Sequence, residues 1–209
     1  MAKLIVIEGI DGAGKQTQAE MLYNALSENY KVLKLSFPNY DSDSSVFIKK
    51  YLNGDYGLYD NIYATSTFFA IDRYLTLREV NFTLYDFIIC DRYTQSNMIH
   101  QGAKLLDEPE KRKYIAWLKE YEYKKLKIPE PDFIFYLYLP LDTALERISN
   151  REKKHENGDI HEENQEYMKT VSVNAKEIAE SENWNIIDCE NKSKEEIHKN
   201  ILNILHEKG

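Results

Sequence analysis

Residues 9–17 have the types and the spacing needed to bind the phosphates of a nucleotide. The segment Gly9-Ile10-Asp11-Gly12-Ala13-Gly14-Lys15 fits the pattern G-x-x-x-x-G-K. Glycines let backbone N–H groups turn inward around a phosphate without Cβ clashes, and the lysine adds a full positive charge near the β and γ groups. We therefore expect this loop to bind ATP through Gly9, Asp11, Gly12, Ala13, Gly14, Lys15, Gln16 and Thr17.

The position after Lys15 departs from this pattern, in which a Ser or Thr hydroxyl normally contacts Mg²⁺. Here it is Gln16, and Thr17 comes one residue later, where it is better placed to reach the α-phosphate. The Gln16 amide oxygen can approach the metal directly or through water. Alternatively, Mg²⁺ can rely on phosphates, waters and a carboxylate, because it keeps several waters in protein sites. The loop therefore predicts ATP and Mg²⁺ as ligands and leaves the metal's protein contacts open.

An acidic and a basic residue follow another apolar run, in Cys90-Asp91-Arg92-Tyr93. If that run is a buried strand beside the phosphate loop, Asp91 is placed to hold Mg²⁺ or one of its waters. The alternative for Asp91 is the N-cap of a helix that starts near Thr94. Arg92 offers a planar fork suited to phosphate oxygens. We expect Lys15, Asp91 and Arg92 to act on the transferred phosphoryl group.

Two aromatic motifs are candidates for binding a nucleobase. Phe37-Pro38-Asn39-Tyr40 ends an apolar run and presents two rings at the same edge of the predicted sheet. Phe69 and Arg73 are four residues apart and share one face of a predicted helix. A ring and a guanidinium on one face can stack on a base and hydrogen-bond its carbonyl. Taken alone, that spacing is more typical of a core Phe beside a surface Arg.

The segment 147–155 gathers the positive charge that an anionic substrate requires. The formal net charge of the chain is −8, so an enzyme of this composition must collect its Lys and Arg locally. Arg151, Lys153 and Lys154 stand in this segment, just before a flexible-looking loop. In isolation it is more typical of a solvated helix end. In a phosphoryl-transfer enzyme it predicts a mobile lid, at about residues 147–162, that brings Arg151 and the lysines onto the transferred group.

The elements that must position these residues alternate along the chain. Five short apolar runs, typical of strands buried on both faces of a parallel sheet, are Leu4–Ile7, Val32–Phe37, Phe87–Cys90, Phe133–Leu139 and Trp184–Ile187. Helical patterns between them are Lys15–Glu28, Asn61–Val80, Pro109–Lys127, Leu141–Arg151, His161–Glu180 and Lys194–Glu207. The alternation predicts an α/β fold, a doubly wound five-stranded parallel sheet flanked by helices. Ligands of such sheets bind at the carboxyl ends of the strands.

Length and composition exclude several other classes of protein. The 209 residues are expected to form one domain, residues 1–209. The negative net charge argues against a protein that coats nucleic acid. Cys90 and Cys189 are far apart, which argues against a zinc site or a disulfide framework. The apolar run near residue 4 is too short for a signal peptide or a membrane span. We expect a cytoplasmic protein without membrane or nucleic-acid partners.

Together these motifs resemble the thymidylate kinase family, and the resemblance covers nearly the whole chain. The matching segments are IEGIDGAGKQTQ at 7–18, FPNYDS at 37–42, FFAIDRY at 68–74, DRYTQSNMIHQG at 91–102 and the basic lid with DIHE at 159–162. A phosphate loop is shared by many enzymes, whereas the ordered set FPxY, FxxxR and DRYxxS is much more specific. The resemblance implies phosphoryl transfer from ATP to thymidine monophosphate (dTMP), which gives ADP and thymidine diphosphate, and it implies a homodimer.

The resemblance also implies roles for single residues. The implied contacts with dTMP are Asp11 at the 3′-hydroxyl, Phe37 and Phe69 at the thymine ring, Arg73 and Asn97 at the base edge, and Tyr40 and Arg92 at the monophosphate. Gly12 stands where some members have an arginine, and Arg151 with the lid lysines would supply that charge here. His100 stands where many members have an aromatic ring against the sugar, and the resemblance implies that it also contacts dTMP.

Two other functions remain open at this point. Deoxynucleoside kinases and kinases for other monophosphates share the sheet, the phosphate loop and an Asp-Arg pair at the third strand. A P-loop protein that uses a nucleotide for regulation also needs residues 9–17. That second function gives no role to the base-pocket residues or to the lid cations.

Overall fold

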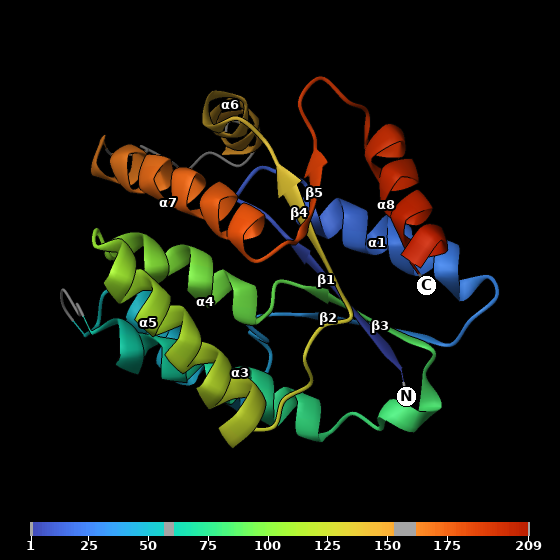
Figure 1. Ribbon diagram of the computed structural model, residues 1–209, viewed down its shortest axis with the longest axis horizontal. Coiled ribbons are helices and arrows are strands. Elements are labelled where there is room, and N and C mark those ends of the chain that lie inside the picture. Colours follow the sequence, from blue (N-terminus) through green and yellow to red (C-terminus); the bar gives the residue numbers. More distant parts are fainter. Residues whose placement is uncertain (1, 57–60, 153–161, 209) are drawn as a thin grey trace.

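The computed structural model describes residues 2–56, 61–152 and 162–208, except for the side chains of residues 151, 152 and 162–164. Its centre is a sheet of five parallel strands in the order β2-β3-β1-β4-β5 (Figure 1). The strands are β1 (Lys3–Glu8), β2 (Val32–Ser36), β3 (Phe87–Asp91), β4 (Phe133–Tyr138) and β5 (Asn185–Asp188). The predicted parallel sheet is confirmed, and every strand boundary lies within one residue of the prediction.

Helices connect the strands and flank the sheet. They are α1 (Lys15–Ser27), α2 (Val46–Leu52), α3 (Ile62–Arg78), α4 (Thr94–His100), α5 (Glu108–Lys119), α6 (Leu141–Glu152), α7 (Glu162–Ser181) and α8 (Lys194–Lys208). All six predicted helices are present. The predicted helix Pro109–Lys127 is divided, because α5 ends at Lys119 and a π-helix occupies Glu120–Lys125. The helix α2 was not predicted, since seven residues are too few to show a helical period.

The core lies on both faces of the sheet, as a doubly wound fold requires. Along β1, Ile5 and Ile7 pack in the same cluster as Leu22 of α1, on one face. Leu4 and Val6 point to the other face and join the cluster that contains residues of α3. Successive side chains of a strand point to opposite faces, so the continuous apolar run of β1 follows from burial on both sides.

The two edge strands depart from the prediction of complete burial. Lys34 and Ser36 of β2 are exposed, and so are Ile186 and Asp188 of β5. An edge strand has a neighbour on one side only, and fewer helices cover it. The apolar pattern therefore identified these two strands correctly but overstated their burial.

The strand order places the loops of interest at one edge of the sheet. The strand β1 lies between β3 and β4, and β3 pairs with β2 on its other side. The chain therefore moves to one side of β1 for its second and third strands and to the other side for its fourth and fifth. Segments 9–14, 37–42 and 92–93 follow the carboxyl ends of β1, β2 and β3, which are neighbours in the sheet. Ligands of such sheets bind at this edge.

Cys90 and Cys189 are both buried and free. Within the part of the chain that the structure describes, no helix combines the length and the apolar composition that crossing a membrane requires.

Candidate active site

The loop between β1 and α1 has the backbone of an anion-binding cradle. Gly12 and Gly14 have φ angles of 85° and 94°, in the left-handed region that side chains rarely adopt. A Cβ atom on Gly12 would lie 2.8 Å from the carbonyl oxygen of Ala144 in α6, so that position has no room for one. Gly14 is the N-cap of α1, and no atom of the described residues lies within 4 Å of the place that a Cβ atom on it would take. The helix thus begins at the loop and directs its free N–H groups into it.

Lys15 lies within this loop, with only 8% of its surface exposed. Its Nζ donates to the carbonyl oxygen of Ile10 at 3.0 Å and lies 3.4 Å from Oδ1 of Asp11. Burial and the nearby Arg92 lower its pKa from the ordinary value, and the surrounding acids oppose this effect. The loop therefore holds a buried lysine whose positive charge is disfavoured by burial and by Arg92, as is favourable for binding a polyphosphate.

Arg92 is held among groups from three segments. Its backbone has a φ of 68°, unusual for a residue other than glycine, at the end of β3. The guanidinium pairs with the Asp11 carboxylate, lies 3.8 Å from Oε1 of Glu8, and has Nη1 3.2 Å from Nε2 of His100. Such non-glycine residues cluster at functional sites, where the surrounding structure maintains the strain.

The pKa values of Asp11 and His100 are shifted by burial and by the charge of Arg92. Burial alone would raise the pKa of Asp11, but the charges of Arg92 and Lys15 outweigh this effect and lower the pKa to about 2. Burial, and then the charge of Arg92, lowers the pKa of His100 to about 3. His100 is therefore a neutral imidazole near pH 7, and its Nε2 can accept a hydrogen bond from Arg92.

Asp91 presents a carboxylate oxygen beside the phosphate loop. Its Oδ1 is buried and has no hydrogen-bond partner among the described residues. The N-cap of α4 is Tyr93, without a side-chain cap, so the alternative of Asp91 as an N-cap is wrong. Burial raises the pKa of Asp91, while Lys15 and Arg92 oppose that rise. A buried oxygen without a donor fits the hard ligand that Mg²⁺ prefers, directly or through water.

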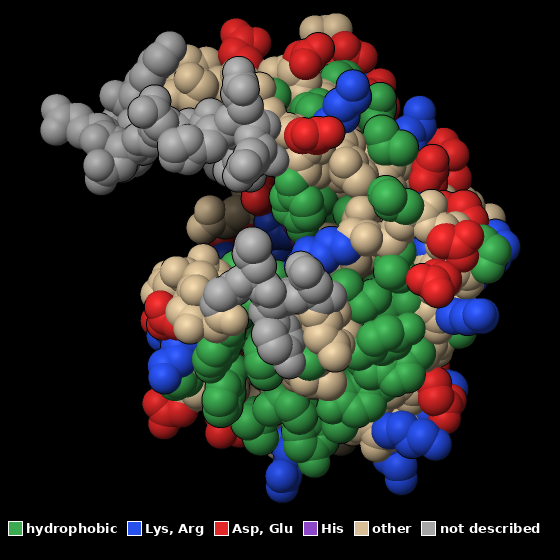
Figure 2. Space-filling view, turned by 90° about the vertical axis from the view of Figure 1, so that its left-hand side faces the viewer, with side chains coloured by type: hydrophobic (Ala, Val, Ile, Leu, Met, Phe, Trp, Pro, Cys, Tyr) green, Lys and Arg blue, Asp and Glu red, His purple; other side chains and the backbone are tan. Residues whose placement is uncertain are grey.

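Most of the predicted site residues line two adjoining cavities. The larger, of about 680 Å³, is lined by Asp11, Phe37, Tyr40, Phe69, Arg73, Arg92, Asn97 and His100, which are all eight residues predicted to contact dTMP. The smaller, of about 520 Å³, is lined by Asp11, Gly12, Gly14, Lys15, Gln16, Thr17, Asp91 and Arg92. In the space-filling view this side of the molecule is hollowed, and Lys or Arg atoms are visible inside the hollow (Figure 2). Gly9 and Ala13 line neither of these cavities.

The two cavities share part of their walls. Asp11, Tyr40 and Arg92 line both. A group bound to the phosphate loop would therefore adjoin a ligand in the larger cavity at a wall that includes Tyr40 and Arg92, the residues predicted to bind the acceptor monophosphate.

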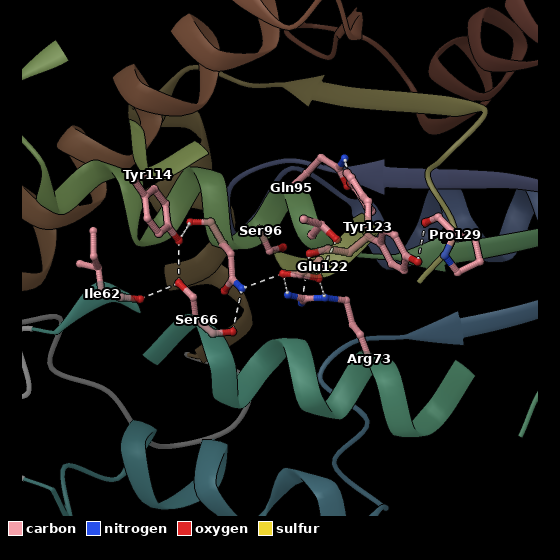
Figure 3. Close-up of polar contacts among 12 residues, drawn as sticks. Ile62, Ser66, Arg73, Gln95, Ser96, Tyr114, Glu122, Tyr123 and Pro129 are labelled. Atoms are coloured by element: carbon pink, nitrogen blue, oxygen red, sulfur yellow. Dashed lines mark hydrogen bonds and ion pairs between the residues drawn. The ribbon is translucent and has the colours of Figure 1, made fainter. Parts of the chain in front are cut away.

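The far end of the larger cavity holds a buried ion pair. Arg73 of α3 is only 2% exposed, and Glu122 of the π-helix is fully buried. Nε and Nη2 of Arg73 donate to the two carboxylate oxygens of Glu122 at 2.7 and 2.6 Å (Figure 3). Burial would lower the pKa of Arg73, but Glu122 raises it above the ordinary value. The alternative of a surface arginine beside a core phenylalanine is therefore wrong, and Phe69 is only partly buried.

The turn that carries Phe37 and Tyr40 is attached to the same helix. Asp72, fully buried next to Arg73 in the chain, accepts from the backbone N–H of Asn39 at 2.8 Å and from the Ser44 hydroxyl. Phe37 is buried against Tyr93, whereas Tyr40 is nearly half exposed at the cavity mouth. One helix therefore fixes both the base end of the cavity and the turn at its phosphate end.

The lid prediction falls largely outside what the structure describes. Residues 147–152 continue α6, but the side chain of Arg151 lies outside the described residues, as do Lys153 and Lys154. Ile148 of α6 lines both cavities, so the described part of this segment borders the site.

Three acidic residues of the site were missed by sequence reasoning: Glu8, Asp72 and Glu122. Glu8 is fully buried at the end of β1, where it accepts from Gly9 N–H at 3.0 Å and from the Ser96 hydroxyl at 2.7 Å. The reasoning that selected Asp91, an acid at the end of a buried strand, applies equally to Glu8. Asp72 and Glu122 lie inside helical segments rich in charge, where nothing distinguishes a buried acid from a solvated one.

Comparison with known proteins agrees with this geometry. The family model for thymidylate kinase matches residues 7–201. The chain belongs to the thymidylate kinase family. A thymidylate kinase of Mycobacterium tuberculosis is 35% identical over 156 residues, which cover 72% of each chain. A probable thymidylate kinase of Methanococcus aeolicus is 31% identical over 212 residues, with 100% of this chain and 98% of the relative covered.

A solved structure of this family has the same fold. The thymidylate kinase of Candida albicans superimposes with a TM-score of 0.73 at 26% sequence identity, and the match covers 99% of this chain and 92% of that one. The phosphate loop, the Asp91-Arg92 pair and the larger cavity therefore stand on the framework of a thymidylate kinase.

Proposed function

We propose that this member of the thymidylate kinase family transfers the γ-phosphoryl group of ATP to dTMP. The observation that carries the proposal is the common wall of the two cavities, which includes Asp11, Tyr40 and Arg92. A donor on the phosphate loop and a nucleotide in the larger cavity would meet at this wall. Phosphoryl transfer requires the acceptor and leaving oxygens roughly in line with the transferred group.

The larger cavity suits a pyrimidine nucleotide with its base directed inward. Its inner end offers the partly buried ring of Phe69 and the buried polar groups of Arg73 and Asn97. Its outer end offers Arg92 and Tyr40, which suit a monophosphate. This polarity supports a substrate that is aromatic at one end and anionic at the other.

The chemistry needs no general base, because an acceptor monophosphate is already anionic near neutral pH. The protein's contribution is alignment and neutralisation of charge by Lys15 and Arg92. Asp91, and Gln16 at the mouth of the phosphate loop, are the side chains that would hold Mg²⁺. When bound, the metal neutralises charge on the donor phosphates. Arg151, which we expect to come from the lid, would add a further cation.

A coupled assay of ADP release tests this function. With ATP as donor, dTMP is expected to be the best acceptor in a panel that includes dUMP, dCMP, dGMP, AMP and thymidine. Preference for thymidine would indicate a deoxynucleoside kinase, and preference for another monophosphate would identify a related kinase. ATP consumption that does not depend on any acceptor would contradict the proposal and favour a regulatory nucleotide-binding protein.

We also propose that two copies associate through α2 and α3. Phe68, Ile71 and Leu75 follow one another at helical spacing along α3, and Ile71 and Leu75 are about two-fifths exposed. Phe47 of α2 is 57% exposed and stacks on Phe68 at 5.7 Å. A continuous apolar surface of this kind on two helices favours a symmetric partner. The cytoplasmic location stays a prediction.

A further inference from the structure

Glu122 accepts hydrogen bonds from both groups that are expected to contact the base. Its carboxylate binds the fork of Arg73, and its Oε1 also accepts from Nδ2 of Asn97 at 3.3 Å. The Thr94 hydroxyl donates to its Oε2 at 2.8 Å. Glu122 comes from the π-helix, whereas Arg73 lies in α3 and Asn97 in α4. Figure 3 shows Glu122 between Arg73 and the chain of contacts that leads to Ser66 and Tyr114.

These contacts determine which way the amide of Asn97 points. Its Nδ2 has two hydrogens, one directed to the backbone oxygen of Ser66 at 3.2 Å and one to Glu122. A carbonyl and a carboxylate can only accept, so the flipped amide would place its oxygen against two acceptors. The orientation leaves Oδ1 of Asn97 without a protein donor in the described part of the chain. Asn97 lines the larger cavity, so it offers a ligand an acceptor there.

Glu122 also limits the donors that Arg73 can offer. Nε, Nη2 and Nη1 each make one hydrogen bond to the protein, the last to the backbone oxygen of Tyr93 at 3.3 Å. Of the five guanidinium hydrogens, two are therefore left without a partner among the described residues, and Arg73 lines the larger cavity. The inner end of the cavity thus presents a fixed donor and a fixed acceptor.

We propose that Glu122 is a positioning residue that sets this donor–acceptor polarity and thereby selects a thymine-type edge over a cytosine-type edge. Thymine offers an acceptor at O4 and a donor at N3, which complements Arg73 and Asn97. Cytosine reverses both, with a donor at N4 and an acceptor at N3, so like groups would face each other. The inference rests on the proposed function, because it takes the larger cavity to be the monophosphate site.

The decisive variant is Glu122→Gln, which keeps the size of the side chain and replaces one acceptor oxygen by a donor. We expect the KM for dTMP to rise and the preference for dTMP over dCMP in kcat/KM to fall, each by at least ~10-fold, because buried polar groups lose their partners. The KM for ATP should stay within about twofold, since its expected site is the other cavity. Glu122→Asp keeps an acceptor-only group, so it should weaken dTMP binding but retain the preference to within about threefold.

Asp132→Asn is the matched control. It makes the same change of acid to amide at the amino end of β4, where Asp132 accepts from Leu4 N–H at 2.7 Å. Its nucleotide preference should equal that of the wild type. A folded Glu122→Gln protein with unchanged preference would overturn the inference, as would an equal loss for dTMP and dCMP, which indicates a structural role alone.

Further measurements keep the inference testable if Glu122→Gln does not fold. Thr94→Val removes the hydroxyl that donates to Glu122. Thr94→Val and Glu122→Asp, as two separate variants, should each raise the KM for dTMP about threefold or more. An unchanged KM in both variants would overturn the inference. A wild-type protein that turns over no pyrimidine monophosphate would instead refute the proposed function. Calorimetry with dTMP and dCMP, without ATP, then makes the same comparison by binding alone.

Discussion

At the scale of single residues, Arg92 connects the two halves of the site. It lines both cavities and contacts Asp11, Glu8 and His100, which belong to different segments. A guanidinium is always charged near neutral pH, and its planar fork can bind oxygens of two phosphates. The neutral His100 can orient this fork without adding charge. We therefore expect Arg92 to bind the acceptor phosphate and to stabilise charge during transfer.

Arg92→Ala should lower kcat by at least ~100-fold, because a preorganised charge partner is lost. Arg92→Lys, which keeps a charge but loses the fork, should recover only part of this activity. Steady-state kinetics with dTMP and ATP provide the measurement, and Arg112→Ala, at an exposed position of α5, is the matched control. Turnover close to that of the wild type in Arg92→Ala would remove Arg92 from the mechanism.

At the scale of elements, two local backbone features shape the site. The phosphate loop needs a glycine at position 12, where the backbone is left-handed and passes directly against Ala144 of α6. The π-helix at Glu120–Lys125 interrupts the regular hydrogen bonding of the segment that begins with α5. Such interruptions occur often at functional sites, and this one contains Glu122. Both features combine local backbone geometry with a close tertiary contact.

Gly12→Ala should distort the phosphate loop. The strain of a left-handed alanine costs about 1–3 kcal/mol, and the clash with Ala144 adds to it. We expect a lower melting temperature and a KM for ATP raised by roughly tenfold or more. Gly54→Ala is the control, because Gly54 has a φ of 78° but no atom of the described residues lies within 4 Å of the place that its Cβ would take. Equal KM values for ATP in the two variants would show that the loop tolerates the methyl group.

At the scale of the whole molecule, the proposed dimer makes a separate prediction. Leu75→Glu places a charge in the exposed apolar surface of α3 and should convert a dimer into a monomer with an unchanged circular dichroism spectrum. Light scattering after size-exclusion chromatography measures this change. Val173→Glu, at a 53% exposed position on α7, is the control and should remain dimeric. A wild-type protein that is already monomeric would contradict the proposed association.

The sequence alone determined the strands, the order of elements and the phosphate loop. These features depend on local patterns, namely continuous apolar runs, helical periodicity and the spacing of Gly9, Gly14 and Lys15. The ends of parallel strands must meet at one edge, so the pattern of strands predicts that Asp91 and Arg92 lie at the same edge as the loop. The strand order, in which β3 adjoins β1, came from the tertiary structure. The resemblance to thymidylate kinases added the residues of the base pocket.

Only the tertiary structure decided which charged groups are buried and which way they point. Arg73 and Glu122 are 49 positions apart in the chain, and the sequence around neither residue shows that they form a pair. Burial depends on which other segments pack against a residue. A buried charge needs a partner, and when that partner is distant in sequence, local patterns do not reveal the pair. For the same reason, the orientation of the Asn97 amide could be assigned only from the tertiary structure, in which Ser66 and Glu122 accept its two amide hydrogens.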